Sequence, residues 1–382
     1  MIPHASLAPN TRKESADGGI LLLYSCQQRA DPSRHEYASQ LALARKLATL
    51  LSYEFGGEFD PARHYAASPY FVPVDTLESL EQAHALGIHG NAHLFGGVVP
   101  HPFVATKVIT HPLVAADAPA PAGWSHELGK RIADVVLPGY SVFSRDDAMR
   151  AATDLLNHGA VRMKKAGGRG GCDQLVIRDQ ASLESALRSV DEEEWAQSGV
   201  VFERNLTQAT THSIGQVQVG TLLATYCGMQ TTTRDHRGNE VYGGSHLTVV
   251  RGGFDALLEL DLNAGTRTAV AQARTYHAAA LTAFPGMFAS RCNYDVAQGY
   301  DDQRQWHSGV LEQSWRIGGA SGAEIAALEA FQATPGLDVV RTSTTELYQA
   351  NPVLPDDAMV YCQQVDPVTG PIVKYARIEA YA

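Results

Sequence analysis

Polar residues follow the apolar pair at 310–311, where a buried strand is predicted to end. They are Glu312, Ser314 and Arg316, and a glycine pair comes next at 318–319. Carboxylate oxygens are ligands that Mg2+ prefers, and the planar guanidinium group of arginine matches phosphate oxygens. The stretch therefore predicts a site for a divalent cation and the phosphates that accompany it. The structural alternative is an ion pair between Glu312 and Arg316 that closes the strand before a glycine turn.

A pair of lysines, Lys164 and Lys165, precedes a glycine-rich loop with the sequence A-G-G-R-G-G at 166–171. Backbone N–H groups of such a loop can hold phosphate oxygens, and a lysine on the preceding strand adds a positive charge. The loop lacks the G-K-[ST] of a Walker motif. Side chains alternate along a strand, so Lys164 is predicted to lie opposite Val161 and Met163 and to face a nucleotide. A glycine hairpin with solvated lysines is the alternative.

Two more carboxylates stand on predicted strands. Asp295 precedes Glu312 by seventeen positions, and Glu203 closes the strand predicted at 199–203. Two carboxylates on neighbouring strand ends beside a lysine–glycine loop fit a magnesium–nucleotide site, because the metal ion neutralises phosphate charge. Glu203 could accept hydrogen bonds from a ribose, and a surface ion pair with Arg204 is the alternative.

Other residues support a site less strongly. Arg251, in V-V-R-G-G, could orient a substrate carboxylate, although an arginine at a strand end is more often structural. The spacing of His212, His246 and His277 does not match a metal site, and no G-x-S-x-G motif supports a Ser-His-Asp hydrolase.

The first part of the chain alternates predicted strands and helices. Strands are predicted at 19–24 and 70–74, and helices at 36–55 and 77–86. This βαβα order implies a parallel sheet with helices on its faces, whose ligands lie beyond the carboxyl ends of the strands. The loop that follows is rich in glycine and proline and contains Lys107.

The rest of the chain is predicted as α+β structure. The composition at 115–123 marks a linker, and residues 136–206 form a compact unit with the glycine hairpin at its edge. The second half is predicted as an antiparallel sheet backed by helices. Its expected strands are 213–219, 222–229, 246–250, 288–296, 359–364 and 372–378, and its expected helices are 266–284 and 323–331.

Charge and composition exclude several classes of protein. The 382 residues carry a net charge of −11 with no basic tract, which argues against nucleic acid and anionic membranes as partners. The N-terminus lacks a signal-peptide pattern, and no apolar run is long enough to cross a bilayer. The five cysteines are scattered and indicate neither disulfides nor a zinc site. A cytoplasmic protein is expected, and the sequence leaves a homo-oligomer open.

The order of these pieces resembles the ATP-grasp superfamily, in particular the glutathione synthetase ATP-binding-domain-like proteins. The resemblance covers about residues 100–332. A lysine with a glycine loop comes first, then a glutamate that ends a strand, then an aspartate on a strand, and last the motif Glu-x-x-x-Arg before glycines. With F-G-G-V-V-P, L-P-G-Y-S-V-F-S and L-E-Q-S-W-R-I-G-G-A-S, the whole chain also resembles a proteobacterial family of unknown function.

The resemblance implies α/β and α+β structure, namely an ATP-grasp fold with an N-terminal pre-ATP-grasp α/β domain. The expected divisions are a flexible N-terminus (1–18), the pre-ATP-grasp domain (19–115), the ATP-grasp domain (116–335, with a glycine-loop lobe at 136–206 and a metal-binding lobe at 207–335) and a C-terminal β extension (336–382).

The resemblance also implies ligands and site residues. ATP and Mg2+ would lie between two α+β lobes, and ATP would phosphorylate a carboxylate that an amine or thiol then attacks. Nucleotide contacts are implied for Lys107, Lys164, Lys165, Gly167, Gly168, Gly170, Gly171 and Glu203. Metal contacts are implied for Asp295, Glu312 and Ser314, and catalytic roles for Arg316, Lys164 and Arg251.

The chain departs from the ATP-grasp pattern at two points. Ser314 stands where the motif Glu-x-Asn has its Asn, which implies weaker or water-mediated binding of a second metal ion. The second phosphate lysine has no clean spacing, and Lys107 is preferred because Lys130 lies in a predicted amphipathic helix.

The resemblance as a whole predicts an ATP- and Mg2+-dependent ligase for small carboxylate and amine substrates. An ATP-binding sensor or scaffold without ligase activity, or a phosphotransferase, is the alternative.

Overall fold

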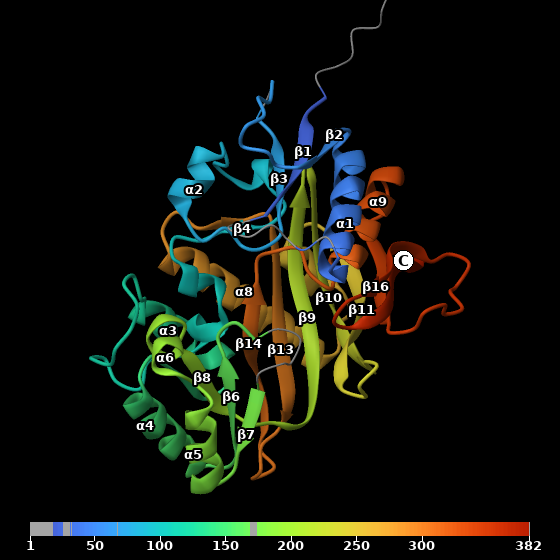
Figure 1. The fold of residues 1–382 in the computed structure, drawn as a ribbon. Helices are drawn as coiled ribbons and strands as arrows, with labels where there is room; N and C mark the ends of the chain where they lie inside the picture. The colour runs from blue at the N-terminus through green and yellow to red at the C-terminus, as the bar shows by residue number, and fades with distance from the viewer. Residues whose placement is uncertain (1–17, 26–30, 32, 67, 169–173, 382) are drawn as a thin grey trace, which may run out of the picture.

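The computed structural model describes residues 18–25, 31, 33–66, 68–168 and 174–381. An N-terminal α/β unit, a small four-stranded lobe and a large eight-stranded sheet make up most of the chain (Figure 1). Within the described residues, no helix combines the length and the apolar composition needed to cross a bilayer.

The N-terminal unit is a parallel sheet in the order β2-β1-β3, as the βαβα pattern predicts. Its strands are β1 (Ile20–Tyr24), β2 (Glu54–Glu58) and β3 (Tyr70–Pro73), and its helices are α1 (His35–Leu51) and α2 (Leu80–Ala85). Leu21, Leu22 and Leu23 of the central strand are fully buried, because both faces of this sheet are covered.

The predicted helix at 36–55 is wrong at its carboxyl end. Helix α1 stops at Leu51, Ser52 takes the left-handed conformation with φ of 58°, and the chain enters β2. A Cβ added at Gly56 would lie 2.5 Å from the side chain of Ile20 in β1, so the strands pack closely at this point. The glycine that appears to end the helical pattern is therefore part of a strand.

The small lobe is an antiparallel sheet in the order β5-β8-β6-β7. Its strands are β5 (Gly139–Val142), β6 (Val161–Lys165), β7 (Gln174–Ile177) and β8 (Val200–Arg204), and its helices are α4 (Arg145–Leu156), α5 (Gln180–Arg188) and α6 (Glu192–Gln197). The helices cover one face of the sheet around Met163 and Trp195. Strands β6 and β7 form the predicted edge hairpin on either side of the glycine loop.

The large sheet is antiparallel throughout, as predicted, in the order β14-β13-β9-β10-β11-β15-β17-β16. Its strands are β9 (Thr207–Val219), β10 (Leu222–Arg234), β11 (Glu240–Arg251), β13 (Arg291–Tyr300), β14 (Trp306–Ser314), β15 (Val339–Leu347), β16 (Met359–Asp366) and β17 (Gly370–Tyr381). The last three strands come from the segment expected as a C-terminal extension, and they continue this sheet.

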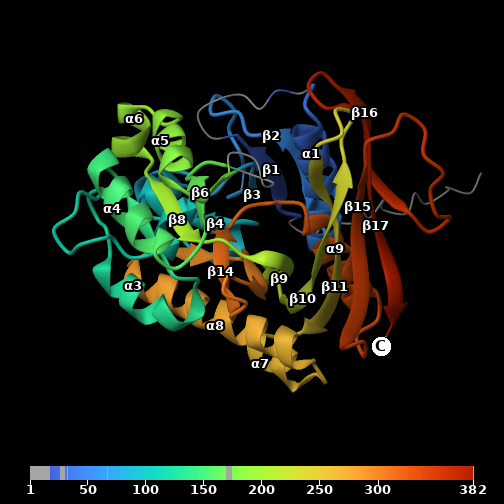
Figure 2. The ribbon, with the colours of Figure 1, turned by 90° about the horizontal axis from the view of Figure 1, so that it is seen from below.

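Helices cover both faces of the large sheet. On one face, α8 (Ala264–Ala283) packs over Tyr294 and Val296, beside α7 (Phe254–Glu259) and α3 (His126–Ile132). On the other face, α1 and α9 (Ser321–Ala333) lie side by side against β15, β16 and β17 (Figures 1 and 2).

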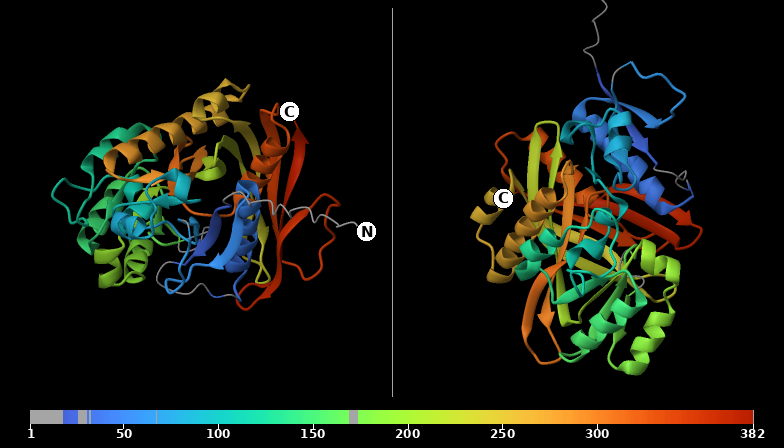
Figure 3. Two further views of the ribbon diagram at one scale, coloured as in Figure 1. Left: turned by 90° about the horizontal axis from the view of Figure 1, so that it is seen from above. Right: turned by 90° about the vertical axis from the view of Figure 1, so that its left-hand side faces the viewer.

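The N-terminal unit and the small lobe lie at different ends of the large sheet (Figure 3). Strand β4 (Gly97–Val98) pairs with β12 (Phe288–Ala289) and joins the segment that follows the N-terminal unit to the start of β13. The N-terminal unit packs with α1 and α9 against the same face of the large sheet.

Candidate active site

A cleft of about 700 Å³ opens on this face of the large sheet and reaches from the small lobe to the first turn of α1. Small-molecule sites commonly enclose ~300–1,000 Å³, so the cleft is large enough for a nucleotide with a second substrate beside it. Alternation along β13 places Asn293 and Asp295 in the cleft, whereas Tyr294 and Val296 face α8.

A β-bulge turns Glu312 into the cleft. Asp295 pairs with Glu312 and Val296 pairs with Val310, so Leu311 is the extra residue of β14. Val310 is buried under α8, whereas Leu311 and Glu312 both line the cleft. Simple alternation from Val310 would have placed Glu312 on the α8 face.

Asp295 and Glu312 bring two carboxylates together as direct cross-strand partners. Burial, followed by repulsion from Glu312, raises the pKa of Asp295 to about 6. Like charges directly opposite one another destabilise a sheet, and a cation between them would remove this repulsion. Paired carboxylate oxygens suit Mg2+, so the residues present fit the metal ion that the resemblance implies.

Lys107 connects Glu312 to the glycine loop. Its Nζ lies 2.7 Å from Glu312 Oε2 and donates to the carbonyl oxygen of Gly168 at 2.6 Å. The Gln313 side chain donates to the carbonyl oxygen of Thr106 at 2.6 Å, which holds the segment before Lys107 against β14. A buried cation thus stands between the carboxylates and the loop.

Three buried groups meet on the small-lobe side of the cleft. Lys164 Nζ lies 2.6 Å from Glu203 Oε1, and His111 Nε2 lies 3.2 Å from Glu203 Oε2. Burial alone would raise the pKa of Glu203, but Lys164 and His111 lower it to about 2. The alternative pairing of Glu203 with Arg204 is wrong, because Arg204 Nη1 donates to Asp301 at 3.0 Å. Lys164 and Glu203 both line the cleft.

A second charged cluster lies at the start of α9. Arg291 Nη2 and Glu324 Oε1 are 2.6 Å apart, and both residues are fully buried. The hydroxyl of Tyr226 donates to Glu324 Oε1 at 2.6 Å. Arg291 Nη1 also donates to the carbonyl oxygen of Arg316 at 2.7 Å, so the cluster holds the loop that joins β14 to α9.

Hydrogen bonds from the same region orient Asp295. Its Oδ1 accepts from Gln230 Nε2 at 2.7 Å and from Asn293 Nδ2 at 2.8 Å. Asn293 is fixed in turn, because its Oδ1 accepts from Ser213 Oγ at 2.6 Å. The structure shows no hydrogen bond from a described residue to Asp295 Oδ2, the oxygen that would face a cation.

Ser314 and Arg316 line the cleft beside these clusters. Strand β14 continues to Ser314, beyond its predicted end, and Ser314 pairs in register with Asn293. Arg316 Nε lies 3.6 Å from Asp75 Oδ1, and Glu312 pairs with Lys107 instead. The alternative of an ion pair between Glu312 and Arg316 is therefore wrong.

Some of the predicted site residues lie elsewhere. Lys165 points away from the cleft, with its Nζ 2.8 Å from Glu194 of α6. Arg251 donates to the carbonyl oxygen of Phe331 at 3.0 Å and stacks on the ring of that residue, at the end of α9. Lys130 is exposed on α3. These residues are not part of the cleft.

The glycine loop is described as far as Gly168. A Cβ added at Gly167 would meet no atom within 4 Å, so the loop borders open space there. Gly170 and Gly171 lie outside the described residues.

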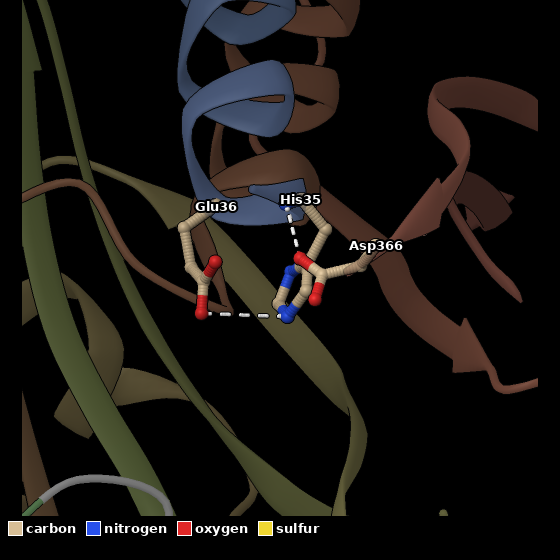
Figure 4. Close-up of side chains that lie close together, drawn as sticks. All are labelled: His35, Glu36 and Asp366. Carbon is tan, nitrogen blue, oxygen red and sulfur yellow. Dashed lines mark hydrogen bonds and ion pairs between the residues drawn. The ribbon is translucent and has the colours of Figure 1, made fainter. Parts of the chain in front are cut away.

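His35, Glu36 and Asp366 form another group, in which one side-chain nitrogen or oxygen atom of each residue lies within 4.8 Å of the others (Figure 4). Asp366 accepts from the backbone N–H of His35, from Arg34 Nε and from two backbone N–H groups of the β16–β17 turn. A carboxylate has about four acceptor positions, so these bonds leave none for a metal ion. Asp366 instead anchors the first turn of α1, while His35 and Glu36 line the cleft.

Sequence reasoning missed several residues of the site. His111 and Gln230 act on partners 92 and 65 positions away, so no local pattern indicates them. Asn293 does carry a signal, because it lies two positions before Asp295 on the same face of a strand.

Solved structures show a similar fold. N5-carboxyaminoimidazole synthetase from Staphylococcus aureus complexed with ADP has a TM-score of 0.52 and 12% identity, over 94% of this chain and 93% of that chain. An ADP complex of N5-carboxyaminoimidazole ribonucleotide synthetase has a TM-score of 0.50 and 12% identity, over 95% of this chain and 93% of that chain. The expected fold is confirmed: the chain has an ATP-grasp fold with an N-terminal α/β domain.

A comparison of the sequence with curated proteins found no match. A family model described as "Protein of unknown function (DUF3182)" matches residues 23–376, which is most of the chain. The proteobacterial origin expected from the sequence stays a prediction. The chain belongs to the family DUF3182.

Proposed function

We propose that this protein is an ATP- and Mg2+-dependent ligase that joins a carboxylate to an amine through an acyl phosphate. The observation that carries the proposal is that Asp295, Glu312 and Lys164 line one cleft, with the buried Lys107 paired to Glu312 behind them. The shared fold supports a nucleotide site here, since two of the similar structures are ADP complexes.

The small-lobe side of the cleft would hold the nucleotide. Lys164 and Lys107 offer two positive charges to the phosphates, and Gly167 and Gly168 offer backbone beside them. Glu203 is ionised at neutral pH because its pKa is about 2, so it can accept hydrogen bonds from ribose hydroxyls. Without a nucleotide, Lys107 pairs with Glu312 and Lys164 pairs with Glu203, and phosphate oxygens would replace these partners when the nucleotide binds.

Asp295 and Glu312 would hold Mg2+, with Ser314 at the edge of the same site. When bound, the ion would neutralise part of the negative charge on the phosphates. Gln230 and Asn293 keep Asp295 oriented through its Oδ1. The repulsion between the two carboxylates makes this position selective for a cation.

The chemistry would proceed in two displacements. A carboxylate oxygen of the acid attacks the γ-phosphorus of ATP, the bond to the β–γ bridging oxygen breaks, and ADP and an acyl phosphate form. The amine nitrogen then attacks the acyl carbon, phosphate leaves with the bonding electrons, and the nitrogen releases one proton to water. Lys164, Lys107 and Arg316 stabilise the negative charge that moves between oxygens in both steps.

The test is the release of ADP and phosphate from Mg-ATP by the purified chain, over a matrix of small acids and amines. Release that requires both an acid and an amine, and that falls at least a hundredfold in Glu312→Gln, is the expected result. ADP formation with a stable phosphorylated product and no amine would instead indicate a phosphotransferase. Because Ser314 stands in place of the Asn of the motif, an ATP-binding sensor or scaffold stays a further candidate, and nucleotide binding without any turnover would support it.

A further inference from the structure

An ion pair between β15 and β17 lines the cleft. These strands lie on the opposite side of the molecule from the small-lobe strands β6 and β8 (Figure 2). Lys374 of β17 and Glu346 of β15 are cross-strand partners, with Nζ 2.9 Å from Oε1. Their side chains are only 8% and 7% exposed. This chain therefore buries two opposite charges at a place remote from the predicted phosphate site.

The pair retains unused hydrogen-bonding capacity. Among the described residues, the contact between Lys374 and Glu346 is the one ionic or hydrogen-bonding contact that either side chain makes. An ammonium group has three donors and a carboxylate has about four acceptor positions. Burying charges with so few partners is unfavourable, and replacing such a pair by apolar residues is often neutral or stabilising. Stability alone therefore does not account for the pair.

His35 contributes a third buried polar group to this end of the cleft. Its side chain is 9% exposed, and its Nδ1 is buried with no hydrogen-bond partner in the described part of the chain. Burial, followed by the charge of Lys374, lowers the pKa of His35 to about 4, so the ring is neutral at pH 7. Glu36, on the same turn of α1, adds a half-exposed carboxylate (Figure 4).

The charges at this end select against ligands with a single charge. A simple acid would face Glu346 and Glu36, and a simple amine would face Lys374. A molecule with both groups can place its carboxylate on Lys374 and its ammonium on a glutamate, and it satisfies both signs at once. His35 can add a neutral hydrogen bond.

Building on the proposed function, we infer that this end of the cleft binds the amine substrate, and that this substrate is an amino acid or a similar small zwitterion. Tyr242 of β11 lines the cleft together with Glu346 and Asp295. Burial raises the pKa of its hydroxyl, and both Glu346 and Asp295 are near enough to add to the rise. Lys374 and the carboxylates Asp295 and Glu312 thus line one continuous cleft.

The test uses the full chain and the twenty standard amino acids as probes, with and without Mg-ADP, followed by calorimetry on each that stabilises the fold. For every binder, the amine without its carboxylate and the acid without its amino group are compared. We expect at least one amino acid to bind, with both single-charge analogues at least tenfold weaker. Lys374→Met and Glu346→Gln should each weaken that binding at least tenfold.

Lys46 and Glu329 supply the matched control, because they form a lysine–glutamate pair of 3.0 Å outside the cleft with side chains 33% and 31% exposed. Lys46→Met should leave amino-acid binding unchanged. The double variant Glu346→Gln/Lys374→Met removes both charges together and guards against misfolding of the single variants. The double variant should keep its nucleotide affinity within twofold of wild type and should no longer bind the amino acid.

The outcomes separate this inference from the proposed function. Nucleotide binding without binding of any amino acid would overturn the zwitterion site alone, as would equal binding to wild type and to the double variant. If the chain binds an amino acid but binds neither Mg-ATP nor Mg-ADP, the zwitterion site is supported and the ligase is overturned.

Discussion

Two charge clusters include residues of β13, and they differ in how well their charges are matched. Arg291 and Glu324 have opposite charges at 2.6 Å, and Tyr226 and the carbonyl oxygen of Arg316 complete their hydrogen bonds. Asp295 and Glu312 have the same charge on neighbouring strands, and Lys107 pairs with Glu312 but not with Asp295.

The difference indicates which cluster holds the fold and which is built for a ligand. The arginine cluster is satisfied within the protein, so its loss should appear mainly as lost stability. The aspartate cluster carries repulsion that a cation would relieve, so changes to it should appear mainly in ligand binding, turnover and pH dependence. The following predictions test this division, from the largest expected effect to the smallest.

Arg291→Met should lower the free energy of unfolding by about 3–5 kcal/mol, because it leaves the buried Glu324 without a counter-charge. Urea unfolding measures the change. The double variant Arg291→Met/Glu324→Gln should recover part of the loss, since it removes both charges. A loss below about 1 kcal/mol would contradict a structural role for the cluster.

Asp295→Asn should become more stable relative to wild type as the pH rises. The pKa of Asp295 is raised from 3.8 to about 6 in the folded state, so its protonation contributes stability that is complete below pH 3.8 and is lost as the pH rises through 6. Urea unfolding at pH 4 and pH 7 without divalent cations should show a relative gain on the order of 3 kcal/mol. A pH-independent difference would show that neither burial nor repulsion from Glu312 raises the pKa of Asp295.

Glu312→Gln should reduce turnover about a hundredfold or more, because it removes one proposed metal ligand and one charge beside Lys107. Steady-state ADP release measures the effect, and unfolding in urea is the control. Its loss of stability should be well below that of Arg291→Met. Wild-type turnover in Glu312→Gln would exclude the carboxylate pair as the metal site.

Lys164→Ala should weaken ATP binding about tenfold, which corresponds to ~1.4 kcal/mol. Lys165→Ala is the matched control, because Lys165 pairs with Glu194 on the far side of the same strand, and its affinity should stay within about twofold. Calorimetric titration with Mg-ATP compares the two variants. Equal affinities would contradict a phosphate contact for Lys164.

Local patterns in the sequence were sufficient for much of the fold. The βαβα order predicted the parallel N-terminal sheet, and alternating runs predicted the antiparallel large sheet. Alternation along V-R-M-K-K also gave the side of β6 on which Lys164 lies, because apolar Val161 and Met163 pack under the helices. These features depend on neighbours within a few residues.

Features set by contacts between distant segments could not be read in this way. The bulge at Leu311 arises from the pairing of β14 with β13, and it decides whether Glu312 faces the cleft or α8. The contact of Lys107 with Gly168 joins residues 61 positions apart. The early end of α1 follows from the pairing of β2 with β1, which overrides the helical pattern of the sequence.

The most direct test of the nucleotide–metal site is thermal unfolding of the purified chain with ADP alone, with Mg2+ alone and with both, in wild type and in Glu312→Gln. A site that needs both ligands predicts that Mg-ADP raises the stability of wild type by about 2.7 kcal/mol at a hundredfold excess over its dissociation constant. ADP alone and Mg2+ alone should stabilise wild type less than both together. In Glu312→Gln, the stabilisation by ADP should no longer depend on Mg2+. No stabilisation at millimolar Mg-ADP, or the same magnesium-dependent rise in Glu312→Gln, would contradict a magnesium–nucleotide site at Asp295 and Glu312.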